Sequence, residues 1–413
     1  MPIVEVRKPG KGAELMQQAD TLGDRLRNVR KRRGLSQREL ADLSGVSVSL
    51  IRKLEQGERE DSRLETVHKL AAALRVPTTA LAAGPDAAEP EREDVEQWAP
   101  VRRALEGRAE EVPAEEPTLE GLGTAFAGVV PLLVANQFAE VRAMLPALLR
   151  DADALVAVSV NGTEAAARRL RSQIRQLTAF LMSQTWQFDV TGHALEMALD
   201  DAGDGLTAMS AIDEKCWGLI RAGRLAETRD LATRWADETE PRRLSRATRD
   251  ELAAWGNFLL RVSAAAVRDN RPGEAREALR LARVAAVATG NDFILGYHPW
   301  QVFGPVTVAV IQAENAMIQD RPETTLAISG QLDVRSFPVS RHYHRHRLDV
   351  AHAHVAVRQY GEAVGVLQEI RRAAPEWLVQ QRYARDILAD VVERRRVLTA
   401  EMRDLADFIR LPL

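Results

Sequence analysis

The stretch QRELADLSGVSVSLIRKLE, residues 37–55, decides how the start of this chain folds. Its apolar residues follow the spacing of two short amphipathic helices. Leu40 and Ala41 share the inward face of the first helix, and Ile51 and Leu54 share that of the second. The small side chain of Ala41 lets the two helix backbones cross closely. The stretch therefore predicts two helices that pack against each other.

Three residues between these helices predict a tight turn. Gly45 can close the first helix in the left-handed conformation, which is least costly for glycine. Val46 is expected to plug the turn, and Ser47 is a favoured cap for the second helix. Two short helices joined in this way form a helix-turn-helix.

With its flanks, the stretch resembles the phage-repressor-like (Xre) family of DNA-binding domains. The resemblance covers residues 22–81 and includes RLRNVRKRRGLSQRELADLSGVSVSLIRKLEQGER and SRLETVHKLAAALRVP, which we interpret as five helices. Ser36 and Glu39 form a capping-box pattern at the start of the second helix. The sequence departs from the family at Ser44, where an apolar residue is usual.

The third helix, residues 47–56, is the expected recognition helix. With its apolar residues turned inward, Val48, Ser49, Arg52 and Lys53 share the outward face. The N-terminal part of such a helix reaches base edges in the major groove. Arg52 or Lys53 could read guanine, and Val48 could contact a thymine methyl group.

The resemblance implies further contacts with double-stranded DNA. Residues that match the family's DNA-contacting positions are Ser47, Val48, Ser49 and Lys53 on the recognition helix, Gln37 as a phosphate clamp that braces this helix, and Arg63 near the minor groove. Arg30 and Glu55 match a pair that ties the first helix to the third. We expect a homodimer on an inverted-repeat operator.

Charge is distributed unevenly along the chain, although its 413 residues carry a net charge of only −3. Residues 21–84 contain thirteen Lys and Arg against eight Asp and Glu, whereas residues 85–120 contain four arginines against twelve acidic residues. A basic module suits a polyanionic partner, and an acidic run is typical of a solvated tether.

Composition and charge divide the chain into four parts. We expect a flexible arm at 1–20, a helix-turn-helix domain at 21–84, an acidic, proline-rich linker at 85–117 and a helical domain at 118–413. Trp98 is an exception within the linker. It either pins a short helix or docks on the following domain.

From residue 118 onward, similar short turns recur, each followed by an amphipathic helix. Small residues after these turns align at intervals of 52, 35, 49, 50 and 38 residues: Ala139, Thr191, Ala226, Ala275, Thr325 and Ala363. Paired helices at such intervals form an α-solenoid. The sequence therefore predicts an all-α fold in which helical hairpins follow the helix-turn-helix.

This half of the chain resembles tetratricopeptide repeats (TPR). The segments FGP (303–305), RHYHRHRLDVAHAH (341–354) and AAPEW (373–377) make it similar to the C-terminal halves of bacterial Xre-plus-TPR regulators of the actinobacterial type. The resemblance implies a domain that senses a small molecule or peptide and mediates dimerisation.

The sequence lacks the common signatures of catalysis and metal binding. It has no GxxxxGK[ST] loop and no GxGxxG after a strand, and its single cysteine, Cys216, has no CxxC partner. Five histidines within 342–354 raise a metal hypothesis, but no HExxH glutamate lies between them and Arg341, Arg345 and Arg347 would repel a cation. We expect no enzymatic activity, no cofactor and no bound metal.

Two further features bear on where the protein resides. No run of 18 apolar residues is present, and the N-terminus lacks the apolar core of a signal peptide. A single cysteine cannot form an internal disulfide, which fits a reducing compartment. We expect a cytoplasmic protein that does not bind membranes.

The connection GNDFILGYHPWQVFGP, residues 290–305, is rich in aromatic residues, which form only 5% of the chain. It is either a hydrophobic latch over a long loop or an insert that lines a ligand site in the hollow of the solenoid. The expected effector-binding residues on the second interpretation are Trp217, Trp255, Asn257, Phe258, Tyr297, His298 and Trp300. Together they would form an apolar cradle with a few polar groups.

These observations predict a one-component transcription regulator whose helical domain responds to an effector. An alternative is a DNA-anchored scaffold whose TPR-like domain binds a partner protein. A third interpretation, an enzyme carried by a DNA-targeting domain, finds no supporting motif.

Overall fold

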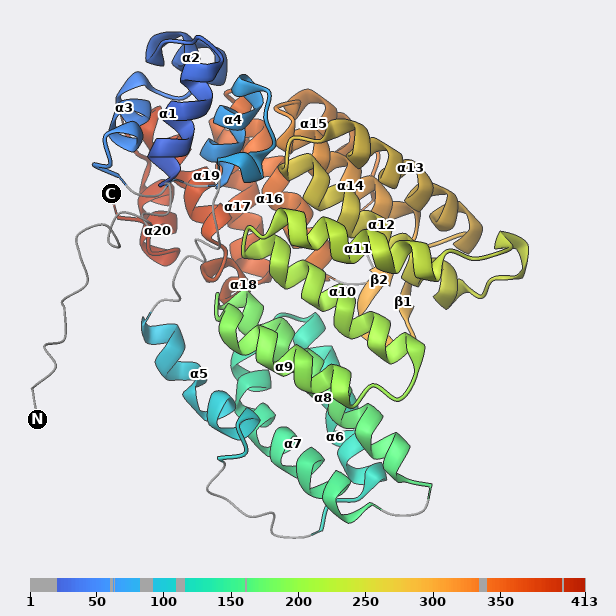
Figure 1. The fold of residues 1–413 in the computed structure, drawn as a ribbon. Helices are drawn as coiled ribbons and strands as arrows, with labels where there is room; N and C mark the ends of the chain where they lie inside the picture. The colour runs from blue at the N-terminus through green and yellow to red at the C-terminus, as the bar shows by residue number, and fades with distance from the viewer. Residues whose placement is uncertain are drawn as a thin grey trace, which may run out of the picture. The chain divides into compact units, whose positions relative to one another are not determined.

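The computed structural model describes residues 21–59, 62, 64–81, 92–108, 116–159, 162–333, 340–395 and 397–412. The chain forms two compact units, Met1–Asp86 and Ala87–Leu413, and α-helices dominate both (Figure 1). The arm expected at 1–20 and the predicted DNA-contacting Arg63 lie outside the described residues. The finer division into arm, linker and helical domain stays a prediction. Among the described residues, no helix has the length and apolar character needed to cross a membrane.

The first unit is a small bundle of helices. Its elements are α1 (Leu22–Arg32), α2 (Gln37–Ser44), α3 (Val48–Glu55), α4 (Leu64–Leu74) and the 3-10 turn Thr78–Ala80. The fully buried side chains at its centre include Leu26, Leu40, Ile51, Leu54 and Leu70. The inward faces predicted for α2 and α3 are confirmed, while the fifth helix is only a 3-10 turn.

The predicted turn between α2 and α3 is also confirmed. Gly45 has φ of 68° and ends α2. At the start of α2, the Glu39 N–H donates to Ser36 Oγ at 3.1 Å, and the Ser36 N–H donates to Glu39 Oε2 at 2.7 Å. At the start of α3, Ser47 Oγ accepts from the Leu50 N–H at 3.3 Å. These caps satisfy backbone groups that a short helix leaves without partners.

Two small residues fix details of this unit that the apolar pattern did not reveal. A Cβ atom at Gly23 would lie 1.9 Å from the carbonyl oxygen of Leu54, so α1 can cross α3 only with a glycine there. At the position that departs from the family, Ser44 Oγ donates to the Leu40 carbonyl at 2.6 Å and accepts from the Val46 N–H at 3.3 Å. The hydroxyl of Ser44 therefore ties the turn where an apolar side chain would only pack.

The second unit is built mainly from consecutive helix pairs. The pairs are α6 (Leu119–Val134) with α7 (Phe138–Val158), α8 (Glu164–Gln184) with α9 (Phe188–Asp200), α10 (Gly205–Arg221) with α11 (Leu225–Thr239), α12 (Arg249–Arg268) with α13 (Pro272–Thr289), α14 (Pro305–Ile318) with α15 (Pro322–Ser329), and α16 (Ser340–Ala356) with α17 (Tyr360–Ala373). Three shorter helices end the unit: α18 (Pro375–Val379), α19 (Arg382–Glu393) and α20 (Ala400–Phe408). The first helix of each pair packs against the first helix of the next (Figure 1).

One turn geometry joins the two helices of all six pairs. Each turn holds one residue with positive φ: Asn136, Trp186, Gly223, Asn270, Asp320 and Arg358. The next residue donates its N–H to a carbonyl in the last turn of the first helix, as Gln187 does to Met182 at 3.0 Å. This is the Schellman arrangement that ends many helices. Because this turn recurs in all six pairs, its position aligns the repeats more reliably than the small residues used in the sequence alignment.

The shared turn corrects the repeat alignment at two places. The residues five positions beyond each positive-φ residue are Val141, Thr191, Thr228, Ala275, Thr325 and Ala363, and all are buried. Ala139 is instead exposed and Ala226 half-buried, two positions too early. The prediction was wrong there because alanine is frequent on both faces of these helices, so a small side chain alone does not fix the register.

The aromatic connection forms a β-hairpin, which is an exception to the predicted all-α fold. Strand β1 (Phe293–Leu295) pairs antiparallel with β2 (His298–Phe303), with Phe293 opposite Phe303. The buried ring of Phe303 lies against Gly256 of α12, where a Cβ atom would be 2.0 Å from Cζ. Aromatic and β-branched residues favour strands, and the helical pattern on either side masked this short segment.

Residues 92–105 differ from the linker that we expect at 85–117, because they form helix α5 (Arg92–Leu105). Trp98 is 3% exposed and Val101 fully buried, and α5 packs against α7. Arg142 of α7 places its guanidinium over the Trp98 ring at 5.8 Å. Both interpretations of Trp98 therefore hold, since it lies on a short helix that packs on α7 within the second unit. Its apolar face outweighs the charge of the surrounding segment.

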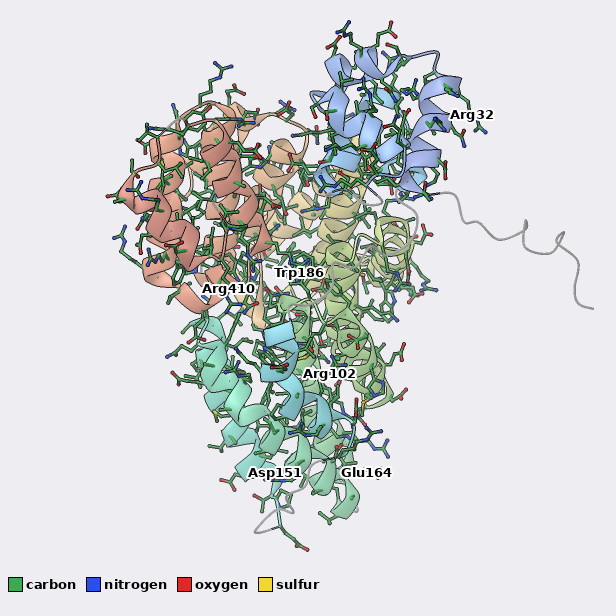
Figure 2. All side chains as sticks on the ribbon, turned by 90° about the vertical axis from the view of Figure 1, so that its left-hand side faces the viewer. Arg32, Arg102, Asp151, Glu164, Trp186 and Arg410 are labelled. Carbon is green, nitrogen blue, oxygen red and sulfur yellow. The ribbon has the colours of Figure 1, made fainter. Side chains whose placement is uncertain are left out.

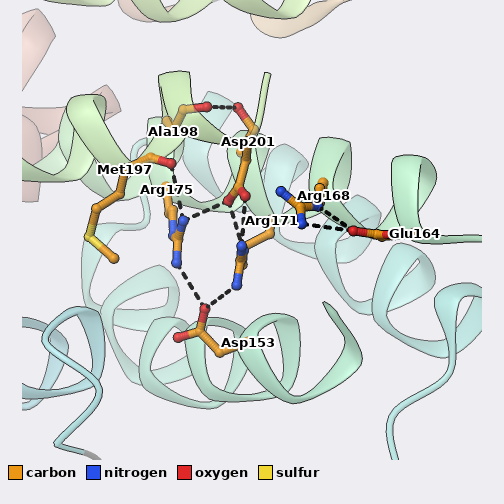
Figure 3. Close-up of polar contacts among 9 residues, drawn as sticks. Asp153, Glu164, Arg168, Arg171, Arg175, Met197, Ala198 and Asp201 are labelled. Carbon is orange, nitrogen blue, oxygen red and sulfur yellow. Dashed lines mark hydrogen bonds and ion pairs between the residues drawn. The ribbon is translucent and has the colours of Figure 1, made fainter. Parts of the chain in front are cut away.

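Buried charges hold α7, α8 and α9 together (Figure 3). Arg171 and Arg175 of α8 both reach Asp201 at the end of α9, each with an N···O distance of 2.6 Å. The same two arginines contact Asp153 of α7 at 3.1 and 2.9 Å. Arg175 also donates to the Met197 carbonyl at 3.1 Å. The cluster is internally paired, so we assign it a structural role.

The first helix pair of this unit also contacts later parts of the chain. The Ala139 N–H donates to Glu376 Oε2 of α18 at 2.8 Å. The ring of Phe126 on α6 meets Trp300 of β2 edge-on, with centroids 6.5 Å apart. These contacts join segments that are far apart in sequence.

Candidate nucleic-acid interface and ligand cavity

The outward face of α3 carries the polar residues that the sequence places there. Ser49, Arg52 and Lys53 are exposed, and Ser47 caps the N-terminus of the helix. Val48 is half-buried and packs against the edge of the core, so only part of its side chain is available to a partner. Hydroxyl, guanidinium and ammonium groups on one helix face can hydrogen-bond to base edges and phosphates.

A buried ion pair orients this helix from behind. Arg30 of α1 donates through Nε to Glu55 Oε1 at 2.6 Å and through Nη2 to Oε2 at 2.7 Å. Gln37 of α2 donates through Nε2 to Glu55 Oε2 at 2.8 Å. Burial opposes ionisation of Glu55, but the bonds from Arg30 and Gln37 outweigh it and lower the pKa of the carboxyl. One carboxylate on α3 therefore links the three helices that frame the outward face.

Further exposed basic side chains lie on α1 and at its C-terminal end. Arg27, Lys31, Arg32 and Arg33 are all exposed. Figure 2 shows Arg32 extending outward from its helix. A cluster of exposed cations is the electrostatic requirement for binding a phosphate backbone.

Residues 26–81 match the helix-turn-helix family HTH_3. This part of the chain is an Xre-type helix-turn-helix domain. The chain is 40% identical over 87 residues to the uncharacterized HTH-type transcriptional regulator RghRB of Bacillus subtilis (strain 168), which covers 21% of this chain and 57% of that protein. It is also 40% identical over 58 residues to the HTH-type transcriptional repressor RghR of the same organism, covering 14% of this chain and 43% of that protein.

The likeness is thus confined to part of each protein, since the chain spans between two-fifths and three-fifths of these relatives. No solved structure matches the chain. The comparisons support DNA-binding transcription regulation through the first unit.

A cavity of about 120 Å³ lies within the second unit. Its walls come from the first helices of five successive pairs, with β2 and α18 completing them. Residues that line it include Gln184 of α8, Trp217 and Arg221 of α10, Asn257, Leu260 and Arg261 of α12, Val310, Ile311 and Glu314 of α14, Arg345 and Asp349 of α16, Gln301 of β2 and Trp377 of α18. Apolar side chains and convergent polar groups thus line the same cavity, and a concave surface with convergent polar groups is a candidate small-molecule site.

Most charged groups on these walls have a partner of opposite charge. Arg261 donates through Nε and Nη2 to the two carboxylate oxygens of Asp213, each at 2.8 Å. Glu314 is 2.5 Å from Arg268 and 3.6 Å from Arg345. At both Glu314 and Asp349, burial raises the pKa of the carboxyl and the nearby arginines lower it, but the balance differs between the two acids. The pKa of Glu314 is lowered by these arginines despite its burial.

Two groups on the walls are poorly compensated. Burial and the charge of Glu314 raise the pKa of Asp349 to about 7, and its Oδ2 atom is buried without a hydrogen-bond partner. Burial and the charges of Arg345 and Arg382 lower the pKa of Arg221 to about 9. The surroundings therefore disfavour the charged form of both groups, the carboxylate of Asp349 and the guanidinium of Arg221.

The structure brings only two of the seven predicted effector residues to this cavity, Trp217 and Asn257. Trp255 and Phe258 are 4% and 1% exposed in the apolar core of α12, and the half-buried Tyr297 packs against the same core. These three side chains are therefore part of the protein's packing.

The remaining two predicted residues, His298 and Trp300, share a buried partner. His298 Nε2 lies 3.1 Å from Glu214 Oε1, and Trp300 Nε1 donates to the same oxygen at 3.0 Å. This placement agrees with the hydrophobic-latch interpretation of the aromatic connection.

Sequence reasoning missed the charged residues of the cavity. Arg221, Arg261 and Arg345 lie on three different helices, in a chain that carries arginines on most of its helices. Nothing in local spacing separates an inward arginine from an outward one when the fold is not known. To find such residues from the sequence, one would first have to know how the helices of the solenoid are aligned and which of their faces turn inward.

The histidines of α16 make separate contacts. His346 Nε2 lies 2.9 Å from Ser329 Oγ, His352 Nδ1 lies 2.9 Å from the Tyr383 hydroxyl, and His354 Nδ1 lies 2.7 Å from Gln359 Oε1. Within the described ranges, no group of three or more His, Cys, Asp or Glu residues could hold a metal ion. Burial raises the pKa of the fully buried Cys216, which keeps its thiol protonated.

Proposed function

We propose that the chain is a sequence-specific transcription regulator that binds double-stranded DNA as a homodimer on an inverted-repeat operator. The residues assigned to DNA contact are Gln37, Ser47, Val48, Ser49, Arg52, Lys53 and Arg63. The exposure of Ser49, Arg52 and Lys53 on one face of α3 supports this assignment. Two such units related by a twofold axis fit two half-sites about one helical turn apart.

We infer that residues 118–413 form a TPR-like solenoid, of the kind found in actinobacterial Xre-plus-TPR regulators. The support is the Schellman turn that recurs in six helix pairs, together with the packing of each first helix against the next. In a solenoid of this kind the first helices line the concave surface, which is the common binding surface.

The effector of this regulator, a small molecule or peptide, binds in the cavity of the second unit. The observation that carries this assignment is that one small cavity touches the first helices of five successive pairs. A ligand there contacts several repeats at once and can favour one packing of the repeats over another. Differential affinity for two such packings is the physical requirement for coupling the cavity to DNA binding.

Two measurements test this function. Selection of bound fragments from a random DNA pool should yield an inverted repeat, bound by two copies of the chain with strong salt dependence. Native mass spectrometry of the purified chain should show a small bound molecule or peptide. Selected DNA without an inverted repeat contradicts the dimer on a palindrome, and a co-purifying protein in place of a small molecule favours the DNA-anchored scaffold.

A further inference from the structure

Arg221 stands apart from the other arginines of the cavity because it has no counter-ion. Its Nε atom is buried without a hydrogen-bond partner. Among the described residues, no carboxylate forms an ion pair with it, while Arg261, Arg268 and Arg345 each have one. Arg221 as a whole is half-buried, and a cation that has lost part of its hydration without gaining an anion costs free energy.

Aromatic rings hold this guanidinium in place. It lies 4.9 Å from the ring centroid of Trp186, labelled in Figure 2, and 6.0 Å from that of Trp217. Trp186 has φ of 62°, an uncommon conformation for a bulky residue. Arg382 covers the same Trp186 ring at 4.1 Å and thus adds a second positive charge nearby. Cation–π contacts orient Arg221, but they do not neutralise it.

Of the acidic groups around the cavity, Asp349 feels the charges of Arg345 and Arg268 and forms no ion pair with Arg221, and the others are already engaged. Asp213 is held by Arg261, and Glu314 by Arg268 and Arg345. Asp292 accepts the backbone N–H groups of Val306 and Thr307 at 2.7 and 2.9 Å. An anion that neutralises Arg221 must therefore come from outside this set of side chains.

We propose that the cavity binds a compact organic acid, whose carboxylate pairs with Arg221 while its apolar body packs against Leu260, Val310 and Ile311. The planar guanidinium matches a carboxylate with two parallel hydrogen bonds. The size follows from the cavity: about 120 Å³ is close to the roughly 150 Å³ that accommodates a benzene ring. This inference rests on the proposed effector function and narrows its ligand from a small molecule or peptide to a small acid.

The test uses the full chain with matched acid and neutral probes. Benzoate and phenylacetate are compared with benzamide and phenylacetamide, which have the same shape without the charge, and inorganic phosphate provides an anion without an apolar body. Thermal unfolding should shift upward by about 2 °C or more with one of the two carboxylates and not with its amide. A shift with phosphate equal to that with the carboxylates assigns the site to inorganic anions and overturns the organic-acid proposal.

Arg221→Met supplies the decisive variant, with Arg276→Met on the exposed side of α13 as its control. Removing an uncompensated charge should raise the melting temperature of the free protein while weakening carboxylate binding about tenfold or more. The control should change neither. The absence of a carboxylate shift that depends on Arg221 overturns the proposal, whatever the stability of the variant.

A DNA-binding measurement separates this proposal from the effector function. If a carboxylate binds through Arg221 but leaves operator affinity unchanged, the anion site stands and effector control through this cavity fails. If the amides bind as well as the acids and change operator affinity, the cavity is an effector site and the requirement for an acid fails.

Discussion

Gln37 and Glu55, eighteen residues apart, meet through a 2.8 Å hydrogen bond from Nε2 to Oε2. The residue expected to hold phosphate thus also braces the helix expected to read bases. Because Nε2 carries two hydrogens, one can remain on Glu55 while the other faces a phosphate oxygen. The proposed phosphate contact of Gln37 is linked in this way to the buried pair Arg30–Glu55.

Glu55→Ala should destabilise the helix-turn-helix unit by about 3 kcal/mol, because it leaves the buried Arg30 without its partner. The pKa of Glu55 is lowered from 4.5 in the folded protein, so its contribution is present above that value and is lost as pH falls through the folded pKa. Denaturant unfolding of the full chain, with exposed Glu58→Ala as control, measures both effects. A difference between wild type and Glu55→Ala that does not shrink at all as the pH falls below 4.5 would contradict the assignment.

Lys53→Ala and Ser49→Ala should change which sequences are bound, because both side chains lie on the exposed face of α3. Gln37→Ala should weaken all sites alike, since phosphate contacts position the protein without reading bases. It should also cost about 1 kcal/mol of stability through the lost bond to Glu55. Selection from a random DNA pool, repeated with each variant, is the measurement. A changed preference in Gln37→Ala, with none in Lys53→Ala, would reverse the two roles.

Asp201→Asn should destabilise the second unit by about 3 kcal/mol or more, because the Asp201 side chain is 2% exposed and serves both Arg171 and Arg175. Asp153→Asn is the matched control. Its side chain is 37% exposed, and we expect a loss of about 1 kcal/mol or less. Urea unfolding followed by circular dichroism compares them. Equal losses in the two variants would show that burial does not set the cost.

The first unit could be predicted nearly completely because its structure is encoded locally. Ser36, Gly45 and Ser47 lie at caps and turns whose chemistry acts over three or four residues, and the structure confirms each of them. Gly23 was missed because its role depends on the backbone of Leu54, which is distant in sequence.

The cavity of the second unit could not be predicted in the same way. The helical pattern reveals which face of a helix is apolar. The distinctive property of Arg221 is that it has no counter-ion in the part of the chain that the structure describes, and this depends on the tertiary fold. Its surroundings come from helices more than a hundred residues away, such as the one that carries Arg345. Aromatic richness was a weaker guide, because large rings such as Trp300 and Phe258 pack into cores more often than they line cavities.

Substitutions at the predicted effector residues should separate core from cavity. Trp300→Ala removes a fully buried ring and its hydrogen bond to Glu214, so it should cost about 3–5 kcal/mol and lower the melting temperature. Asn257→Ala and Trp217→Phe change side chains that line the cavity and are not fully buried. For Asn257→Ala we expect a change in stability within about 1 kcal/mol.

The response to carboxylate should depend on the cavity variants, which cost little stability, and not on Trp300→Ala, which costs the most. With benzoate or phenylacetate as probe, Asn257→Ala and Trp217→Phe should alter the concentration that changes operator affinity while the fold is intact. Trp300→Ala should lose the response only to the extent that the protein unfolds, as circular dichroism at the assay temperature would show. A folded Trp300→Ala variant without a response, beside cavity variants that respond normally, would place the ligand at the β-hairpin instead.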